Sequence, residues 1–360
     1  MQKIIFRAMA GARTMAGAMA LVALTGCGAY AQSHQEPFIQ KSLAGQAISQ
    51  VTAETSGGNI TVAGAHDADA RLEIYVWVSN QRDRDEGLSK EEIQKRLNEQ
   101  YDLTVDVADH KLTVIAKAKT HFMNWGRGIS ISYKIYVPSN VTTRLRTSGG
   151  NIAMKDLNGA QQDFRTSGGN LDLARLGGRI KGSTSGGNIS IDDAKDDIDL
   201  STSGGNIDAR HCKGTIRLST SGGNLELTGL SGTIHATTSG GNVSGGEVEG
   251  ELNTHTSGGN VDLQDLSCSL ETSTSGGEIS VSMRQLGKFL IIGNSSGDIS
   301  LSLPGDKGVD LKVYGSRIKT SGMGNFKGET DEKRLEGSMN GGGIPVKIDG
   351  GSGRVSLAFK

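Results

Sequence analysis

A repeated pentapeptide is the feature that most constrains the fold of this chain. Thr-Ser-Gly-Gly-Asn, or a close variant, recurs between residues 147 and 278, and its first residue advances by 19 positions once and by 18 positions six times. These first residues are Thr147, Thr166, Thr184, Thr202, Thr220, Thr238, Thr256 and Thr274. A constant step of this size is typical of a repeat architecture, in which each unit packs only on its neighbours.

The apolar residues of each unit predict strands. The residue five places after each repeat Thr is always aliphatic, and a second aliphatic residue often follows two places later. A period of two is typical of strands, whereas the glycine pair disfavours helices. Stacking the units places like residues about 4.8 Å apart and pairs their backbones. We therefore predict an all-β fold, a three-sided single-stranded parallel β-helix (β-solenoid) with about 18 residues per coil.

The Gly-Gly-Asn part of each unit predicts a sharp corner. Gly and Asn adopt positive φ more readily than other residues, so we expect them to supply it at the turn. Stacked Asn side chains can also form a ladder along such a corner. The predicted structural turn ladder consists of Asn151, Asn170, Asn188, Asn206, Asn224, Asn242 and Asn260. We interpret this row as structural, not as a catalytic or metal-binding row.

The amino-acid composition indicates the type of core and limits the classes of partner. The 360 residues include 53 glycines and only 4% aromatic residues, which favours a narrow aliphatic core. The net charge of −1 offers no basic stripe, so no nucleic-acid partner is expected. Cys212 and Cys268 fall three units apart, roughly 14 Å at the coil spacing, which is too far for a disulfide. We expect both to be small buried residues.

The N-terminus predicts export. Basic residues precede an apolar run over residues 15–24, which is typical of a signal peptide and short for a membrane span. Leu24-Thr25-Gly26-Cys27 resembles the lipobox of bacterial lipoproteins, which implies lipidation at Cys27, and Gly28 is no inner-membrane retention signal. The alternative is cleavage after Ala29-Tyr30-Ala31. The first predicts an outer-membrane lipoprotein anchored to the membrane; the second predicts a periplasmic or secreted protein.

The chain divides into five predicted parts. These are a lipoprotein-type signal peptide (1–27), a tether (28–46), a first coil with a strand and helix insertion (47–146), the regular solenoid (147–298), and degenerate coils with a C-terminal cap (299–360). Within the insertion we predict strands over 71–78, 103–107, 111–116 and 129–137, and a helix announced by the capping box of Ser89 and Glu92. An open solenoid end exposes unpaired strand edges, so the insertion is expected to cap it.

Three features carry a resemblance to a known family. The Ser-Gly-Gly-Asn-Ile repeats, the strand at 133–138 just before the array, and the exported N-terminus resemble the bacterial putative-adhesin β-helix family, a domain of unknown function. The resemblance covers roughly residues 47–360. It implies a β-helix that acts at the cell envelope, and it carries over no functional residues. Glu278 in place of the corner Asn, and the insertion before Thr147, depart from the pattern.

Few of the polar residues suit an enzymatic or metal site. Parallel β-helices also host polysaccharide lyases and hydrolases, which need clustered catalytic carboxylates and basic residues. Four acidic residues gather on one coil, namely Asp192, Asp193, Asp196 and Asp197. They suit either a solvated corner or a Ca²⁺ site, and basic residues in neighbouring coils favour the corner. The histidines His211, His235 and His255 do not stack, so no Zn²⁺ site is expected. We predict no catalytic residue, no metal and no cofactor.

The remaining candidates are ligand contacts. Small hydroxyls repeat along the coils and suit either a solvated exterior or an ordered ligand such as a glycan. Trp125 and Arg127 suit sugar stacking or a partner contact, with burial in the cap as the alternative. We predict a non-enzymatic cell-envelope adhesin or scaffold that binds a glycan, cell wall or protein, with no oligomeric state assigned. The alternatives are a carbohydrate-active β-helix enzyme and an envelope-stress sensor or regulator.

Overall fold

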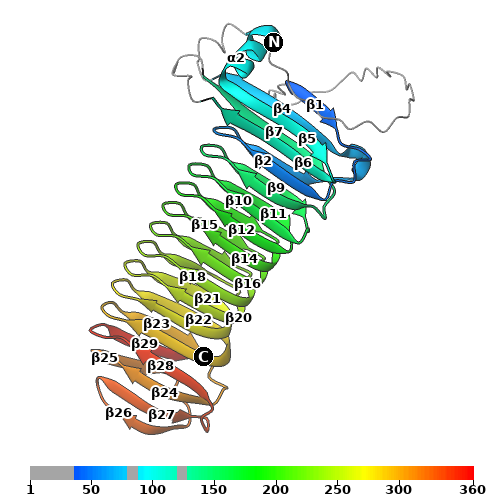
Figure 1. The fold of residues 1–360 in the computed structure, drawn as a ribbon. Coiled ribbons are helices and arrows are strands. Elements are labelled where there is room, and N and C mark those ends of the chain that lie inside the picture. The colour runs from blue at the N-terminus through cyan, green and yellow to red at the C-terminus, as the bar shows by residue number, and fades with distance from the viewer. Residues whose placement is uncertain (1–35, 79–87, 120–127) are drawn as a thin grey trace, which may run out of the picture.

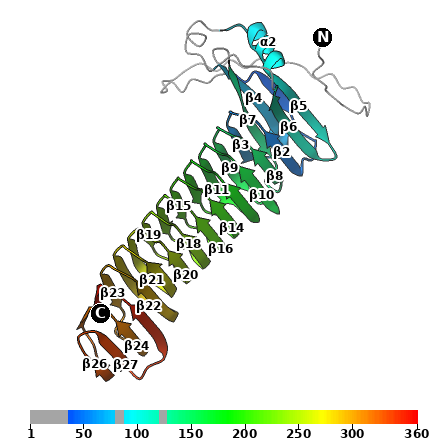
Figure 2. The same cartoon turned by 60° about the vertical axis from the view of Figure 1, so that its left-hand side comes forward.

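The chain coils along one axis into a long rod (Figures 1 and 2). The computed structural model describes residues 36–78, 88–119 and 128–360. Each regular coil has two strands, joined on one side by the Thr-Ser-Gly-Gly-Asn bend and on the other by a short turn. Ile189 pairs with Ile207 in the next coil, and Ile207 pairs with Leu225. The predicted parallel β-solenoid with an 18-residue coil is confirmed, and the bend is the third segment of each coil.

The strands that follow each bend make up what we name face 1. In spatial order they are β1 (Ile39–Ser42), β4 (Arg71–Val78), β7 (Ile129–Val137), β3 (Ile60–Gly64), β9 (Ile152–Leu157), β11 (Leu171–Leu176), β13 (Ile189–Asp192), β15 (Ile207–Arg210), β17 (Leu225–Thr228), β19 (Val243–Gly246), the first parts of β21 (Val261–Thr274) and β22 (Ile279–Asn294), β23 (Ile299–Leu303), β29 (Arg354–Phe359) and β25 (Arg317–Ser321). From β7 to β25 all neighbours are parallel.

The strands that precede each bend make up face 2. In spatial order they are β5 (Tyr101–Ala108), β6 (Lys111–Ala118), β2 (Gln50–Glu54), β8 (Thr142–Arg146), β10 (Gln161–Arg165), β12 (Arg179–Ser183), β14 (Lys195–Ser201), β16 (Lys213–Ser219), β18 (Ser231–Thr237), β20 (Glu249–His255), the second parts of β21 and β22, β28 (Ile344–Asp349), β24 (Val309–Tyr314), β27 (Arg334–Met339) and β26 (Phe326–Thr330).

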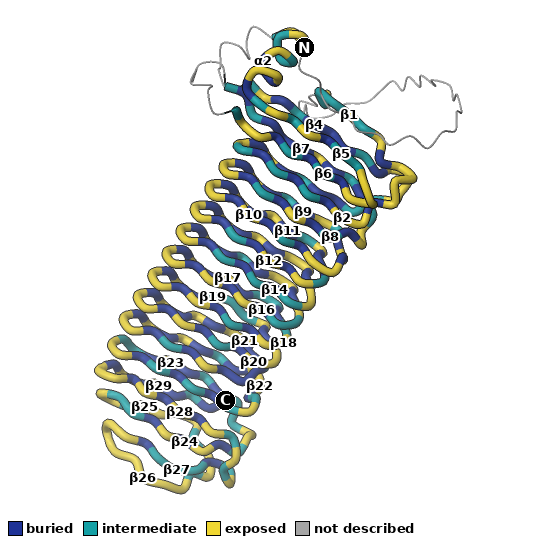
Figure 3. The backbone as a smooth tube through the Cα atoms, in the orientation of Figure 1, coloured by how far each residue is buried: buried dark blue, intermediate teal, exposed yellow. Residues whose placement is uncertain are grey.

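The core lies between the two faces and is aliphatic. Buried and exposed residues alternate along most strands, as Figure 3 shows. Phe164 is an aromatic residue in this mainly aliphatic core. Gly182 in the next coil leaves space for its ring, because a Cβ at residue 182 would lie 2.0 Å from that ring. Cys212 and Cys268 are buried and free, as predicted. Burial raises the pKa of their thiols to about 11 and about 12 respectively, which makes both unreactive.

The insertion caps the N-terminal end, as predicted. β6 and β7 form an extra coil outside that of β2 and β3. Antiparallel β5 and β4 then close the two faces. Beyond β3 lies the short 3₁₀ turn η1 (Asp67–Asp69), and helix α2 (Lys90–Gln100) covers this end (Figure 1). The Ser89 hydroxyl accepts a hydrogen bond from the Glu92 N–H (3.3 Å), which confirms its capping role. β1 falls within the segment assigned to a tether, and its pairing with β4 places it in the cap instead.

The C-terminal end is closed by a strand exchange that the sequence did not indicate. After β23 the chain passes outward to β24 and β25, turns through the antiparallel β26 and β27, and then comes back. β28 inserts between β22 and β24. β29 inserts between β23 and β25. The last strands of the chain therefore lie against residues far earlier in the sequence.

The glycines of the bends serve close packing, which corrects the expectation of positive φ. Neither they nor the ladder Asn residues between 147 and 277 have positive φ. A Cβ on the second glycine of each bend would lie 1.9–2.0 Å from a carbonyl oxygen of the preceding coil, which leaves no room for any side chain. Positive φ occurs at the opposite corner, where φ is 51–63° at Asp156, Arg175, Asp193, His211, Gly229, Glu247 and Asp265.

Candidate functional site

The repeated Asn residues form one continuous row along the bends. Each Oδ1 accepts a hydrogen bond from the backbone N–H of the matching residue in the next coil, at 2.8–2.9 Å. The row runs through Asn59, Asn151, Asn170, Asn188, Asn206, Asn224, Asn242 and Asn260 to the N–H of Glu278. Within the described residues, the Nδ2 groups of this row have no protein partner. They form a line of exposed donors at the coil spacing of about 4.8 Å.

A polar groove of about 430 Å³ runs beside four of these Asn residues. We name it the amide groove. One wall is Asn206, Asn224, Asn242 and Asn260, and the other is Asp208, Glu226, Ser244 and Asp262. The second wall comes from face 1, where these four residues pair in register across β15, β17, β19 and β21. Amide donors thus oppose a wall made chiefly of carboxylate acceptors. A sugar hydroxyl can accept from one wall and donate to the other.

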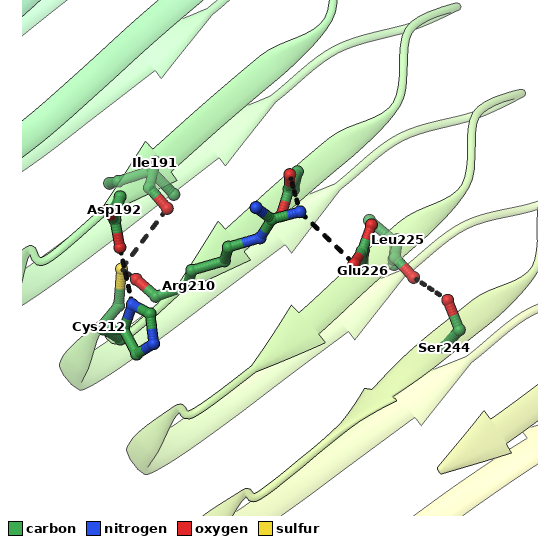
Figure 4. A network of polar contacts seen from close by, with 9 residues as sticks. Ile191, Asp192, Arg210, Cys212, Leu225, Glu226 and Ser244 are labelled. Atoms are coloured by element: carbon green, nitrogen blue, oxygen red, sulfur yellow. Dashed lines mark hydrogen bonds and ion pairs between the residues drawn. The ribbon is translucent and has the colours of Figure 1, made fainter.

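Asp208 is a partly buried acid of the amide groove. Arg210 lies 2.8 Å from Asp208 Oδ2 and 3.5 Å from Glu226 Oε1, and Figure 4 shows Arg210 reaching toward Glu226 on the next strand. The other oxygen, Oδ1, is buried without a hydrogen bond in the structure. Burial raises the pKa of Asp208, Arg210 opposes this shift, and Glu226 adds to it. A perturbed carboxyl in a groove is a candidate for function.

The acidic corner predicted near residue 192 is satisfied by its neighbours. Asp192 lies 2.8 Å from His211 Nδ1, and the Asp196 carboxylate accepts the Gly178 N–H at 2.9 Å. Asp197 pairs with Arg179 at 3.7 Å and with Arg217 at 3.5 Å. Asp193 occupies the left-handed turn. Within the described part of the chain, no three or more His, Cys, Asp or Glu side chains are placed to hold a metal ion.

Two of the predicted sites lie outside the described residues. These are the lipidation site Cys27 and the ligand-contact pair Trp125 and Arg127. The carboxylate wall was missed in the sequence, although it could have been found there, because its members all stand two places after a ladder Asn. Of the helices in residues 36–78, 88–119 and 128–360, none combines the length and apolar character needed to cross a bilayer.

Two solved structures and one family model match this chain. Two solved structures align over 89% of this chain. One is a "putative cell adhesion protein" from Clostridium sporogenes ATCC 15579, with 10% identity, 98% of its own chain covered and a TM-score of 0.18. The other is a "putative adhesin" from Bacteroides fragilis NCTC 9343, with 11% identity, 95% covered and a TM-score of 0.25. No curated protein matches the chain. The model of one family, Toastrack DUF4097, matches residues 80–358, which bears out the resemblance to a family of unknown function. The chain belongs to the Toastrack DUF4097 family.

Proposed function

We propose that this protein is a non-enzymatic binding protein of the cell envelope that holds an extended glycan along face 1. The observation that carries the proposal is the amide groove, where free amide donors face carboxylate and hydroxyl acceptors coil after coil. A linear sugar chain presents hydroxyls at regular intervals, so each sugar can repeat the contacts of the last. The carboxylates favour neutral or amine-bearing sugars over acidic ones.

The arrangement of the carboxylates supports binding more than hydrolysis. Glycosidases place two carboxyl groups on opposite sides of the scissile bond, one as an acid and one as a base or nucleophile. Asp208, Glu226 and Asp262 instead line a single wall in register, and Arg210 pairs with the first two. One wall of acceptors can orient a sugar chain, but it cannot flank a bond.

Asp208→Asn is expected to weaken glycan binding about tenfold, because the charge-assisted hydrogen bond from a sugar hydroxyl to the Asp208 carboxylate is lost. The same change is expected to stabilise the fold by about 1 kcal/mol, because it removes the charge of a carboxylate that is partly buried. The raised pKa of Asp208 predicts a change in the same direction. The folded state disfavours the charged carboxylate, so the free energy of unfolding falls as pH rises through the pKa of Asp208. Calorimetry with a β-1,4-linked glucosamine hexamer and a β-1,4-linked glucose hexamer measures binding, and urea unfolding measures stability.

Asp199→Asn is the matched control for this substitution. Asp199 is a partly exposed residue on face 2 that pairs with Lys181 at 3.8 Å, so its loss is expected to leave glycan binding unchanged. Wild-type protein that binds neither hexamer, or an Asp208→Asn variant that binds both as tightly as wild type, would contradict the proposed function.

We also propose that the chain is exported and held in the outer membrane by a lipid on Cys27. The lipobox-like Leu24-Thr25-Gly26-Cys27 supports this proposal. Mass spectrometry of the mature N-terminus is expected to find diacylglycerol and a fatty acyl chain on Cys27, and Cys27→Ser is expected to prevent acylation. An unmodified chain that begins at Gln32 would show soluble export instead. Trp125 and Arg127 remain proposed ligand contacts, and Trp125→Ala belongs in the same glycan assay.

A further inference from the structure

Face 1 carries a second groove, built by the strand exchange at the C-terminal end. Two rows of outward residues cross the paired strands β22, β23, β29 and β25. The first row is Ser280, Ser300, Ser356 and Lys319, and the second is Ser282, Ser302, Ala358 and Ser321. They line a groove of about 620 Å³, which Gln264 and Lys360 also border. We name it the hydroxyl groove.

The hydroxyl groove differs in charge from the amide groove beside it. The first row continues the wall that holds Asp208, Glu226 and Asp262, because Asp262 pairs with Ser280. From Ser280 onward the acids are replaced by serines, and the row ends at Lys319. No Asp or Glu side chain lines this groove. Its polar side chains are therefore hydroxyls, the Gln264 amide and two ammonium groups, beside the apolar residues Val281, Leu301, Leu357 and Ala358.

Apart from the Gln264 amide, which donates to Asp262 Oδ1 at 3.3 Å, these groups are free to meet a ligand. Ser282 Oγ accepts the Asp265 N–H at 3.0 Å, which leaves its own hydroxyl proton to donate. The hydroxyls of Ser280, Ser300, Ser302 and Ser356 have no protein partner in the part of the chain that the structure describes. Nor does any described carboxylate side chain pair with Lys319 or Lys360. Unpaired ammonium groups beside hydroxyl donors are the chemistry that recognises an oxyanion.

We propose that the hydroxyl groove binds an acidic sugar, with the serines donating to its oxyanion and hydroxyls, and with Lys319 and Lys360 balancing its charge. The groove is long enough to span four strands, which favours a sugar over a lone ion. This site does not depend on the proposed function of the amide groove, which selects the opposite charge. A single glycan that occupies both grooves would place its acidic sugars in the hydroxyl groove, nearer the C-terminal end of the protein.

Calorimetry on the mature chain tests the site with an oligogalacturonate and inorganic phosphate. Wild type is expected to bind the oligogalacturonate, more weakly at high salt, and Asp208→Asn, which alters the amide groove, is expected to bind it equally well. The double variant Lys319→Gln/Lys360→Gln is expected to lose about tenfold or more in affinity for the acidic oligomer. Ser302→Leu, which fills the groove without changing charge, is expected to lower the affinity as well.

The matched control is Lys327→Gln/Lys347→Gln, which removes two exposed lysines from face 2. It is expected to bind the oligogalacturonate as wild type does. Equal loss in this control, or full binding by the Lys319→Gln/Lys360→Gln variant, would overturn the site. Phosphate that binds as tightly as the oligomer would overturn the assignment to a sugar. Failure of the glucosamine oligomer to bind would contradict the function proposed for the amide groove but not the site in the hydroxyl groove, so the two proposals are tested separately.

Discussion

Gly223→Ala is expected to destabilise the solenoid by more than about 4 kcal/mol, in the range reserved for severe core disruption. The added Cβ would lie 1.9 Å from the carbonyl oxygen of Gly205 and 2.4 Å from its carbon. Both atoms belong to the backbone of the preceding coil, so no side chain can rotate to relieve the clash. The coils would have to separate at this bend, which breaks the Asn and Thr hydrogen bonds that join them.

Gly222→Ala is the control, because it makes the same chemical change one residue away. Its nearest neighbour would be the Ser203 carbonyl oxygen at 3.7 Å, an ordinary contact, and its φ is not left-handed. We expect a change below about 0.5 kcal/mol. Urea unfolding followed by circular dichroism measures both variants. Similar losses in the two would mean that the coils are not stacked as the structure shows.

The sequence was sufficient to predict the solenoid because every signal in the repeat agrees. The 18-residue step, the alternating aliphatic residues and the glycine pair all require like residues to stack, and the observed register bears this out. The cap was predictable for a similar reason, since β4 and β7 alternate clearly and Ser89 marks the start of α2. Such patterns lie within one segment of the sequence, so they can be recognised without knowing which distant residues that segment contacts.

Other features could not be predicted because they depend on distant contacts or on backbone approach. Nothing local to Ser356 indicates that it pairs with Ser300, since that pairing arises only when β29 inserts between β23 and β25. The corner at Arg175 and His211 carries no glycine signal, although both have positive φ. The bend glycines are evident in the sequence but their packing role is not, because the distance between stacked carbonyls is absent from sequence patterns. Neither groove was therefore foreseen as a site.

The Thr that opens each repeat has a larger role than its regular spacing suggests. Thr220 is buried, its hydroxyl donates to the Gly205 carbonyl of the preceding coil at 2.8 Å, and it accepts the Gly223 N–H of its own bend at 3.2 Å. The hydroxyl therefore satisfies two backbone groups that the tight glycine packing keeps from water. The same pair of bonds recurs at Thr166, Thr184, Thr202, Thr238, Thr256 and Thr274.

Thr220→Val is accordingly expected to cost about 2–4 kcal/mol of unfolding free energy, although the two side chains have nearly the same shape, because a buried N–H and a buried carbonyl each lose a partner. Thr220→Ser keeps the hydroxyl and is expected to lose only about 1 kcal/mol, the contribution of one buried methyl group. Thr237→Val makes the identical change at an exposed position of face 2 and is expected to be nearly neutral. If urea unfolding placed Thr220→Val level with Thr237→Val, the hydroxyl would not bridge the coils, and the stacking of the bends would depend on the glycines and the Asn row alone.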